Sequence, residues 1–353
     1  MPYDRASCNR RHPTMRIPFL SLLIPLLVAN VSHGQEIRFA DLGTCALESA
    51  EIIEECRIGY RTIGELNAQR DNAVLIPTWY GGTTEAWPDL QAQLLGENHD
   101  YFVVLVAAIG NGVSISPSNS DVQPMDAFPR FTTRDMVRSQ YRLATEELGL
   151  ERLHAVMGIS MGGMQTFEWG MLYPEFMDKL VPIAGSPDLA GHDVALWETY
   201  KRLLQWSVSC DCDEAAEALA AIRLMNSTTS DQAGADMPGE TALGRIEAAA
   251  SNRIDAGIAT NLIWQADAMM ATDVTQAFEG DWAAAAEAVQ AKVLIIVGSS
   301  DHVVTPGPAE AFAEYLGAKA RLIIFNNDCG HDIPGCEMFR SRSLIREFLA
   351  ERD

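Results

Sequence analysis

The feature that most constrains the fold is the segment Gly158–Gly163, which reads Gly-Ile-Ser-Met-Gly-Gly. An apolar run typical of a strand precedes it from Leu153, and apolar residues at helical spacing follow it from Met164. A serine between glycines, where a strand turns into a helix, is typical of a strained turn that exposes a nucleophilic hydroxyl at the edge of a sheet. The glycines have a steric reason, because a turn this sharp leaves no room for side chains beside Ser160.

The rest of the chain alternates between buried-strand patterns and helical patterns. Strands are expected at 72–76, 101–108, 153–157, 179–184, 291–298 and 321–325, and helices at 133–148, 308–316 and 340–351. This alternation predicts an α/β fold with a mostly parallel central sheet and helices on both faces. Two further strands joined by a turn, 43–50 and 56–63, are expected to precede it as an antiparallel pair.

The segment 187–290 interrupts this alternation with alanine-rich helical periods and no clear strand. We therefore expect an inserted helical cap there. The predicted organisation is a core in two parts, 35–186 and 291–353, with the cap between them and a signal peptide at 1–34.

The signal peptide is predicted from a positive flank that ends at Arg16, an apolar run over 17–28, and small residues before Gln35. Met15 is an alternative start. The run is shorter than the ~20 residues of a membrane span, so we expect cleavage before Gln35 and no stable span afterwards; an uncleaved anchor is the alternative. The predicted location is secreted or periplasmic.

Cysteine usage agrees with export, because six cysteines remain after the predicted signal peptide. Local pairs are expected between Cys45 and Cys56 and between Cys329 and Cys336, although six cysteines allow 15 pairings. Cys210 and Cys212 are too close in sequence for an easy bridge, and they either pair under strain or stay reduced.

The net charge of the whole chain is -22. Residues 1–34 contain four arginines and one aspartate, which leaves -25 on the remainder. A surface this acidic argues against nucleic acid and anionic membranes as partners.

A serine hydroxyl needs a base to remove its proton, and His331 follows the last expected core strand. Loops after parallel strands gather at one edge of the sheet, where Ser160 is also expected. Asp301 lies in the loop after the strand 291–298, so the chain order is Ser, Asp, His. We therefore expect Ser160 as nucleophile, His331 as general base and Asp301 as the acid that orients it. His302 is the alternative base if the neighbouring loop were reversed.

The tetrahedral intermediate of such a reaction needs preformed N–H donors. Met161 is expected to supply one, because its N–H follows the nucleophile directly. Tyr80 is expected to supply the second from the loop after strand 72–76, where Gly81 allows close approach. An ordinary turn is the competing interpretation of the glycines in that loop.

The expected substrate contacts are Trp79, Gly81 and Asp332. Asp332, beside His331, is expected to contact an amine or hydroxyl of the substrate; the competing interpretation is a solvated loop carboxylate. No C-x-x-C pair or second histidine cluster indicates zinc, and we expect neither a metal nor an organic cofactor.

Several motifs resemble those of the homoserine O-acetyltransferase family of the α/β-hydrolase fold. They are Ser160–Gln165, Glu168-Trp169, Tyr173-Pro174, the segment 60–67 with Asn72, and Gly330–Asp332. The resemblance covers about 40–186 and 291 to the end, and it implies an acyl-enzyme mechanism with Ser160, Asp301 and His331. Because the related transferases are commonly dimers through their caps, it also implies a possible homodimer.

Two departures from that family bear on the reaction. The loop 78–82 reads Thr-Trp-Tyr-Gly-Gly where the transferases carry a His-Ala-Leu-Thr-Gly type of loop. The segment 187–290 lacks the Ala-Arg-Met-Ile-Gly-His type of segment in which their arginine holds an amino-acid carboxylate. Acetyl-CoA is also not expected outside the cytoplasm.

These observations predict an exported serine hydrolase that cleaves a small acyl ester. The alternative is an O-acyltransferase like the homoserine O-acetyltransferases, with the same three residues and an alcohol in place of water. A non-catalytic binding protein is disfavoured, because all three residues of the expected triad are present.

Overall fold

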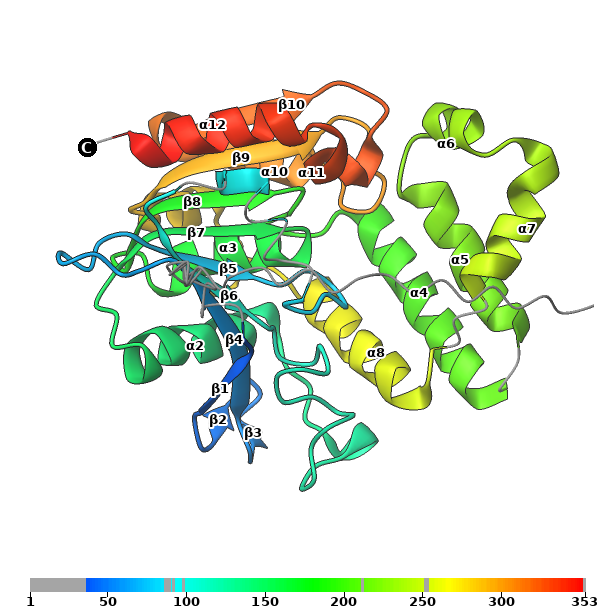
Figure 1. The fold of residues 1–353 in the computed structure, drawn as a ribbon, viewed down its shortest axis with the longest axis horizontal. Coiled ribbons are helices and arrows are strands. Elements are labelled where there is room, and N and C mark those ends of the chain that lie inside the picture. Colours follow the sequence, from blue (N-terminus) through cyan, green and yellow to red (C-terminus); the bar gives the residue numbers. More distant parts are fainter. Residues whose placement is uncertain are drawn as a thin grey trace, which may run out of the picture. The chain divides into compact units, whose positions relative to one another are not determined.

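The computed structural model describes residues 36–351 apart from five short segments, and the described residues cluster into one unit (Figure 1). The segments left out are 86–89, 91–92, 97–98, 211–212 and 251–253. The expected signal peptide lies outside the described residues.

A mixed sheet forms the centre of this unit. Within the described residues it has eight strands, in the order β1 (Arg38–Asp41), β4 (Arg57–Ile63), β6 (Phe102–Val106), β5 (Ala73–Pro77), β7 (Leu153–Ile159), β8 (Met177–Ile183), β9 (Lys292–Gly298) and β10 (Ala320–Phe325). The strands from β6 to β10 in this order run parallel, whereas β4 is antiparallel to both of its neighbours. The predicted mostly parallel sheet is therefore confirmed.

Helices cover both faces of the sheet. The core helices are α2 (Thr133–Arg142), α3 (Met161–Leu172), α10 (Gly307–Leu316), α11 (Ile333–Cys336) and α12 (Met338–Ala350). Along β5, Leu75 belongs to the apolar core on the side of α2, α3 and α10. Its neighbours Val74 and Ile76 belong to the second core, on the side of α12. Successive side chains of a strand point to opposite faces, so a continuous apolar run is what a doubly covered strand requires.

Helices fill the chain between β8 and β9, as the alanine-rich pattern predicts. They are α4 (Gly191–Cys210), α5 (Asp213–Asn226), α6 (Ser230–Asp236), α7 (Gly239–Ala250), α8 (Ala256–Met270) and α9 (Trp282–Ala288). We call 191–288 the insertion. In Figure 1, α4 and α8 lie side by side, and the two helices pack against each other.

The N-terminal strands differ from the prediction. The expected strand 43–50 is wrong, because only β2 (Cys45–Ala46) is extended there, and it pairs with β3 (Ile52–Ile53). The expected strand 56–63 is confirmed as β4, but it pairs with β1 and β6 rather than with residues 43–50, and the sequence pattern did not indicate β1. The reason is that β1 is a short edge strand with one buried residue, Ala40, so its alternation is weak.

The two local disulfides are confirmed. Cys45 is bonded to Cys56 with a Cα–Cα distance of 5.5 Å, and Cys329 to Cys336 with a distance of 6.2 Å. Cys212 lies outside the described residues, so the structure does not describe whether it pairs with Cys210. Among the described helices, none is both long and apolar enough to cross a membrane.

Candidate active site

Ser160 lies at the turn between β7 and α3 in a strained backbone conformation. Its φ is 57° and its ψ is -121°, values that a residue with a side chain rarely adopts. A Cβ added at Gly158 would lie 2.1 Å from the carbonyl oxygen of Gly162, and one added at Gly162 would lie 2.7 Å from that of Pro77. The steric reason predicted for the glycines is confirmed. The turn holds the serine hydroxyl at the carboxyl edge of the sheet.

Three of the residues expected to do chemistry come together at this edge. His331 Nε2 lies 3.0 Å from Ser160 Oγ, and His331 Nδ1 lies 2.7 Å from Asp301 Oδ2. The other oxygen of Asp301 accepts the backbone N–H groups of Val303 (2.8 Å) and Val304 (3.0 Å). The Asp301 side chain is therefore anchored in its own loop and presents one oxygen to the imidazole.

Carboxylates surround His331. Burial lowers the pKa of His331, but the negative charges of Asp301, Asp332 and Asp193 outweigh it and raise the pKa above that of an ordinary histidine. Burial in turn raises the pKa of Asp332, and His331 opposes this rise. Such a set of charges favours the imidazolium that forms when a histidine takes a proton from serine.

The alternative base does not lie at this position. His302 lies beside His192, with a distance of 6.5 Å between ring centroids, while the hydrogen bond of Ser160 is made with His331. His154 is a structural histidine, since its Nε2 bonds the carbonyl oxygen of Leu349 at 2.9 Å. Among the described residues, no group of three or more potential ligands is arranged to hold a metal ion.

The reactive residues open onto a cavity of about 720 Å³. Ser160 and His331 lie on its wall, and so do all the other residues expected there from the core: Trp79, Tyr80, Gly81 and Asp332. Leu90 and Ile159 add apolar surface from the core side. The cavity is of the size that takes a small organic molecule.

The backbone N–H groups of Met161 and Tyr80 are available as donors. In the described part of the chain, neither group has a hydrogen-bond acceptor. Gly81 N–H, by contrast, donates to Gln265 Oε1 at 2.8 Å, and Gly82 N–H donates to the Trp79 carbonyl at 3.0 Å. These two bonds hold the loop that presents the Tyr80 N–H.

The insertion supplies cavity residues that the sequence did not reveal. They include Trp197, Tyr200, Arg223 and Leu262. No motif marks them, because helical periodicity predicts only which face of a helix is buried and not what that face meets. Arg223, which comes from α5, has no ion pair or side-chain hydrogen bond in the described part of the chain. It does not lie in the Ala-Arg-Met-Ile-Gly-His type of segment in which the transferases carry their carboxylate-binding arginine.

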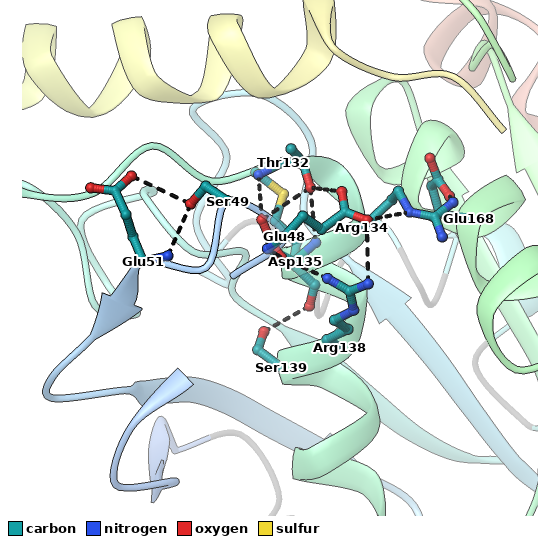
Figure 2. Close-up of polar contacts among 10 residues, drawn as sticks. Glu48, Ser49, Glu51, Thr132, Arg134, Asp135, Arg138, Ser139 and Glu168 are labelled. Atoms are coloured by element: carbon teal, nitrogen blue, oxygen red, sulfur yellow. Dashed lines mark hydrogen bonds and ion pairs between the residues drawn. The ribbon is translucent and has the colours of Figure 1, made fainter. Parts of the chain in front are cut away.

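A polar network joins α3 to α2 and to the β2–β3 hairpin (Figure 2). Arg134 bonds Glu168 Oε2 at 3.2 Å through one nitrogen and Glu48 Oε1 at 2.8 Å through another. The Glu168 side chain is fully buried, and burial raises its pKa to about 8 against the opposing charge of Arg134. Burial therefore favours the neutral form of the Glu168 carboxyl group, and Arg134 favours its ionised form. The network connects α3, the helix that follows Ser160, to the N-terminal part of the chain.

A family model described as alpha/beta hydrolase fold matches residues 72–334. A probable esterase of Corynebacterium glutamicum is 38% identical over 173 residues, which are 47% of this chain and 49% of that protein. A homoserine O-acetyltransferase of Moorella thermoacetica is 37% identical over 168 residues, which are 42% of this chain and 44% of that protein. The chain thus spans about half the length of these curated relatives.

A solved structure gives the same picture over more of the chain. An acetylester hydrolase from Corynebacterium glutamicum superimposes with a TM-score of 0.80 at 25% identity, covering 90% of this chain and 96% of that one. The resemblance to homoserine O-acetyltransferases that the motifs indicate is confirmed, and the relatives fall into two reaction classes.

Proposed function

The chain belongs to the alpha/beta hydrolase fold family, and from this premise we propose that it is an exported serine hydrolase that cleaves small acyl esters. The observation that carries the proposal is the hydrogen-bonded series from Ser160 through His331 to Asp301, which opens onto the 720 Å³ cavity. An acetylester hydrolase and a probable esterase among the similar proteins support small acyl groups, acetate first.

In the proposed mechanism, Ser160 Oγ attacks the ester carbonyl carbon while His331 Nε2 takes the hydroxyl proton. Asp301 holds the other ring nitrogen and stabilises the imidazolium. The N–H groups of Met161 and Tyr80 donate to the oxyanion of the tetrahedral intermediate. The C–O bond to the alcohol breaks, and the alcohol leaves with the proton from His331. In the second half of the reaction, His331 takes a proton from a water molecule, which attacks the acyl carbon. The bond to Ser160 Oγ then breaks, Ser160 regains its proton from His331, and the acid is released.

The competing function is O-acyl transfer, in which an alcohol replaces water in the second half of the reaction. The homoserine O-acetyltransferase among the relatives and the shared motifs around Ser160 favour it. Two observations favour hydrolysis. The insertion lacks the arginine segment of the transferases, and the predicted signal peptide and the disulfides point to a compartment without acetyl-CoA.

Two measurements test the proposal. A fluorophosphonate probe should label the wild-type protein and fail to label Ser160→Ala; an unlabelled wild-type protein would exclude the serine-enzyme mechanism. Acetate release from ethyl acetate is then compared with acetyl transfer from acetyl-CoA to homoserine. Efficient transfer with negligible hydrolysis would establish the competing function.

Export is tested separately. Protein recovered from the periplasm or the medium should begin at Gln35 when its N-terminus is sequenced. Recovery of uncleaved protein in the membrane fraction would favour the anchor instead.

A further inference from the structure

Asp193 is a buried carboxylate of the insertion that contacts the loop carrying Asp301. It lies in the first turn of α4 and is 0% exposed. Its Oδ2 accepts two hydrogen bonds from Thr305, one from the backbone N–H at 3.1 Å and one from the hydroxyl at 3.0 Å. A carboxylate is costly to bury unless such donors satisfy it, so this contact is specific rather than incidental.

Thr305 lies near the end of the loop between β9 and α10, and Asp301 lies nearer to its start. The near end is held from within, since Asp301 Oδ1 accepts from Val303 and Val304. The far end is held from outside by Asp193. The loop that delivers the acid to His331 is therefore fixed by two carboxylates, one from the core and one from the insertion.

The loop carrying His331 also contacts the insertion. The His331 N–H donates to the carbonyl of Ser227 at 3.0 Å. Thr229 donates its hydroxyl to Asp328 Oδ1 at 3.1 Å. Both loops are thus anchored on the insertion as well as on the sheet: the Asp301 loop on α4, and the His331 loop on the connection between α5 and α6.

We propose that Asp193 is a positioning residue for the reaction: from the insertion it fixes the Asp301 loop, and its negative charge stabilises the imidazolium of His331. This inference rests on the proposed function. It assigns the insertion a part in the chemistry as well as in the shape of the cavity.

The charges around His331 support the electrostatic part. Burial lowers the pKa of His331, and Asp301, then Asp332, then Asp193 raise it. These three come from the loop after β9, from the histidine loop itself and from α4.

Three cationic or titratable groups also bear on Asp193 and the site. His192 Nδ1 lies 3.4 Å from Asp193 Oδ1, and His302 lies beside His192. Arg223 lines the same cavity as His331 from α5. His192 and His302 are kept in every variant, so a difference between the pH profiles of two variants does not come from these two side chains.

The test compares Asp193→Asn with Thr305→Val. The amide oxygen of Asp193→Asn can still accept from Thr305, so this variant removes the charge and keeps the contact. Thr305→Val removes the hydroxyl bond and keeps both the charge and the backbone bond. The measured quantities are kcat/KM for ethyl acetate from pH 5 to 9 and the titration of the His331 ring by NMR.

Loss of the charge should lower the pKa of His331, so the acid limb of the Asp193→Asn profile should move to lower pH. On the plateau, kcat should fall roughly threefold, because the imidazolium loses a neighbouring negative charge. Thr305→Val should lose activity without moving the acid limb. The electrostatic part of the proposal is overturned if Asp193→Asn and wild type have superimposable profiles and the same His331 titration. The positioning part is overturned if Thr305→Val keeps the kcat of wild type.

The controls separate this proposal from the proposed function. If wild-type protein neither hydrolyses the ester nor takes the fluorophosphonate label, the proposed function fails, whatever the His331 titration shows. If wild type is active and only the Asp193 effects are missing, the proposal for Asp193 alone fails. Thermal unfolding of each variant shows whether it is folded, and Asp193→Asn is preferred to Asp193→Ala because it leaves no unpaired donors at Thr305.

Discussion

Helix α3, which follows Ser160, and the outer helices of the insertion, α6 and α7, are packed in opposite ways. In α3 every residue from Met161 to Gly170 is buried, whereas α6 has no buried residue and α7 has only Ala250. The first helix carries the strained serine turn, which persists only where the surroundings are packed closely enough to hold it. The outer helices meet solvent on nearly all sides.

Between these extremes lie α4 and α8, which face the core and the cavity. Trp197 and Tyr200 of α4 and Leu262 of α8 line the cavity, and Asp193 reaches the Asp301 loop. The insertion is therefore not uniform. Its inner helices, α4 and α8, pack in the core and line the cavity, whereas its outer helices, α6 and α7, are largely exposed.

The largest expected effect tests whether the core loops carry the chemistry. Asp301→Asn should lower kcat for ethyl acetate by about 10³- to 10⁴-fold, because the imidazole loses its orienting carboxylate. Asp332→Asn is the matched control, since it removes the exposed carboxylate next to His331, and it should leave kcat within about threefold. Equal losses of kcat in both variants would show that Asp301 contributes no more to the reaction than the neighbouring carboxylate of Asp332.

The second prediction tests the division within the insertion. Leu204 of α4 is fully buried, and Leu243 of α7 is 74% exposed. Leu204→Ala should lower the free energy of unfolding by about 2–5 kcal/mol, because it leaves a cavity. Leu243→Ala should change it by no more than about 0.5 kcal/mol. Urea unfolding measures both, and similar losses would mean that the outer helices are packed as tightly as the inner ones.

The third prediction concerns the packing that holds α3. Because the folded pKa of Glu168 is raised to about 8, folding favours its protonated form. Its contribution to stability is present below about pH 4.5 and is lost as the pH rises to about 8. Glu168→Gln removes this titration, so relative to wild type it should gain roughly 1–3 kcal/mol between pH 5 and pH 8. A variant that is equally destabilised at every pH would instead indicate an ionised Glu168 paired with Arg134.

The smallest expected effect concerns specificity. Leu262 is 8% exposed on the cavity wall, so Leu262→Ala should enlarge the space for the acyl chain. The ratio of kcat/KM for ethyl butyrate to that for ethyl acetate should rise about 5- to 10-fold. Leu243→Ala, in the same insertion but away from the cavity, should keep the wild-type ratio. An unchanged ratio in both variants would place the acyl chain elsewhere.

Much of the core could be predicted from the sequence because its signals are local. The glycines around Ser160, the apolar runs of β5 and β9, and the short spacing of Cys329 and Cys336 each act over a few residues. Local sterics and alternation translate such patterns directly into turns, strands and a short disulfide loop. Chain order and the rule that loops gather at the carboxyl edge were enough to bring His331 and Asp301 to that serine.

Contacts between residues far apart in sequence were decided only by the tertiary structure. The pairing of β1 with β4, the bond from Asp193 to Thr305 and the network of Glu48, Arg134 and Glu168 join residues far apart in sequence. No local pattern encodes them, because a charged residue near the end of a helix looks the same whether it meets water or a buried partner. The turn at Ser160 and its contacts with His331 and Asp301 thus follow from the sequence, whereas packing decided which parts of the insertion contact the loops of Asp301 and His331.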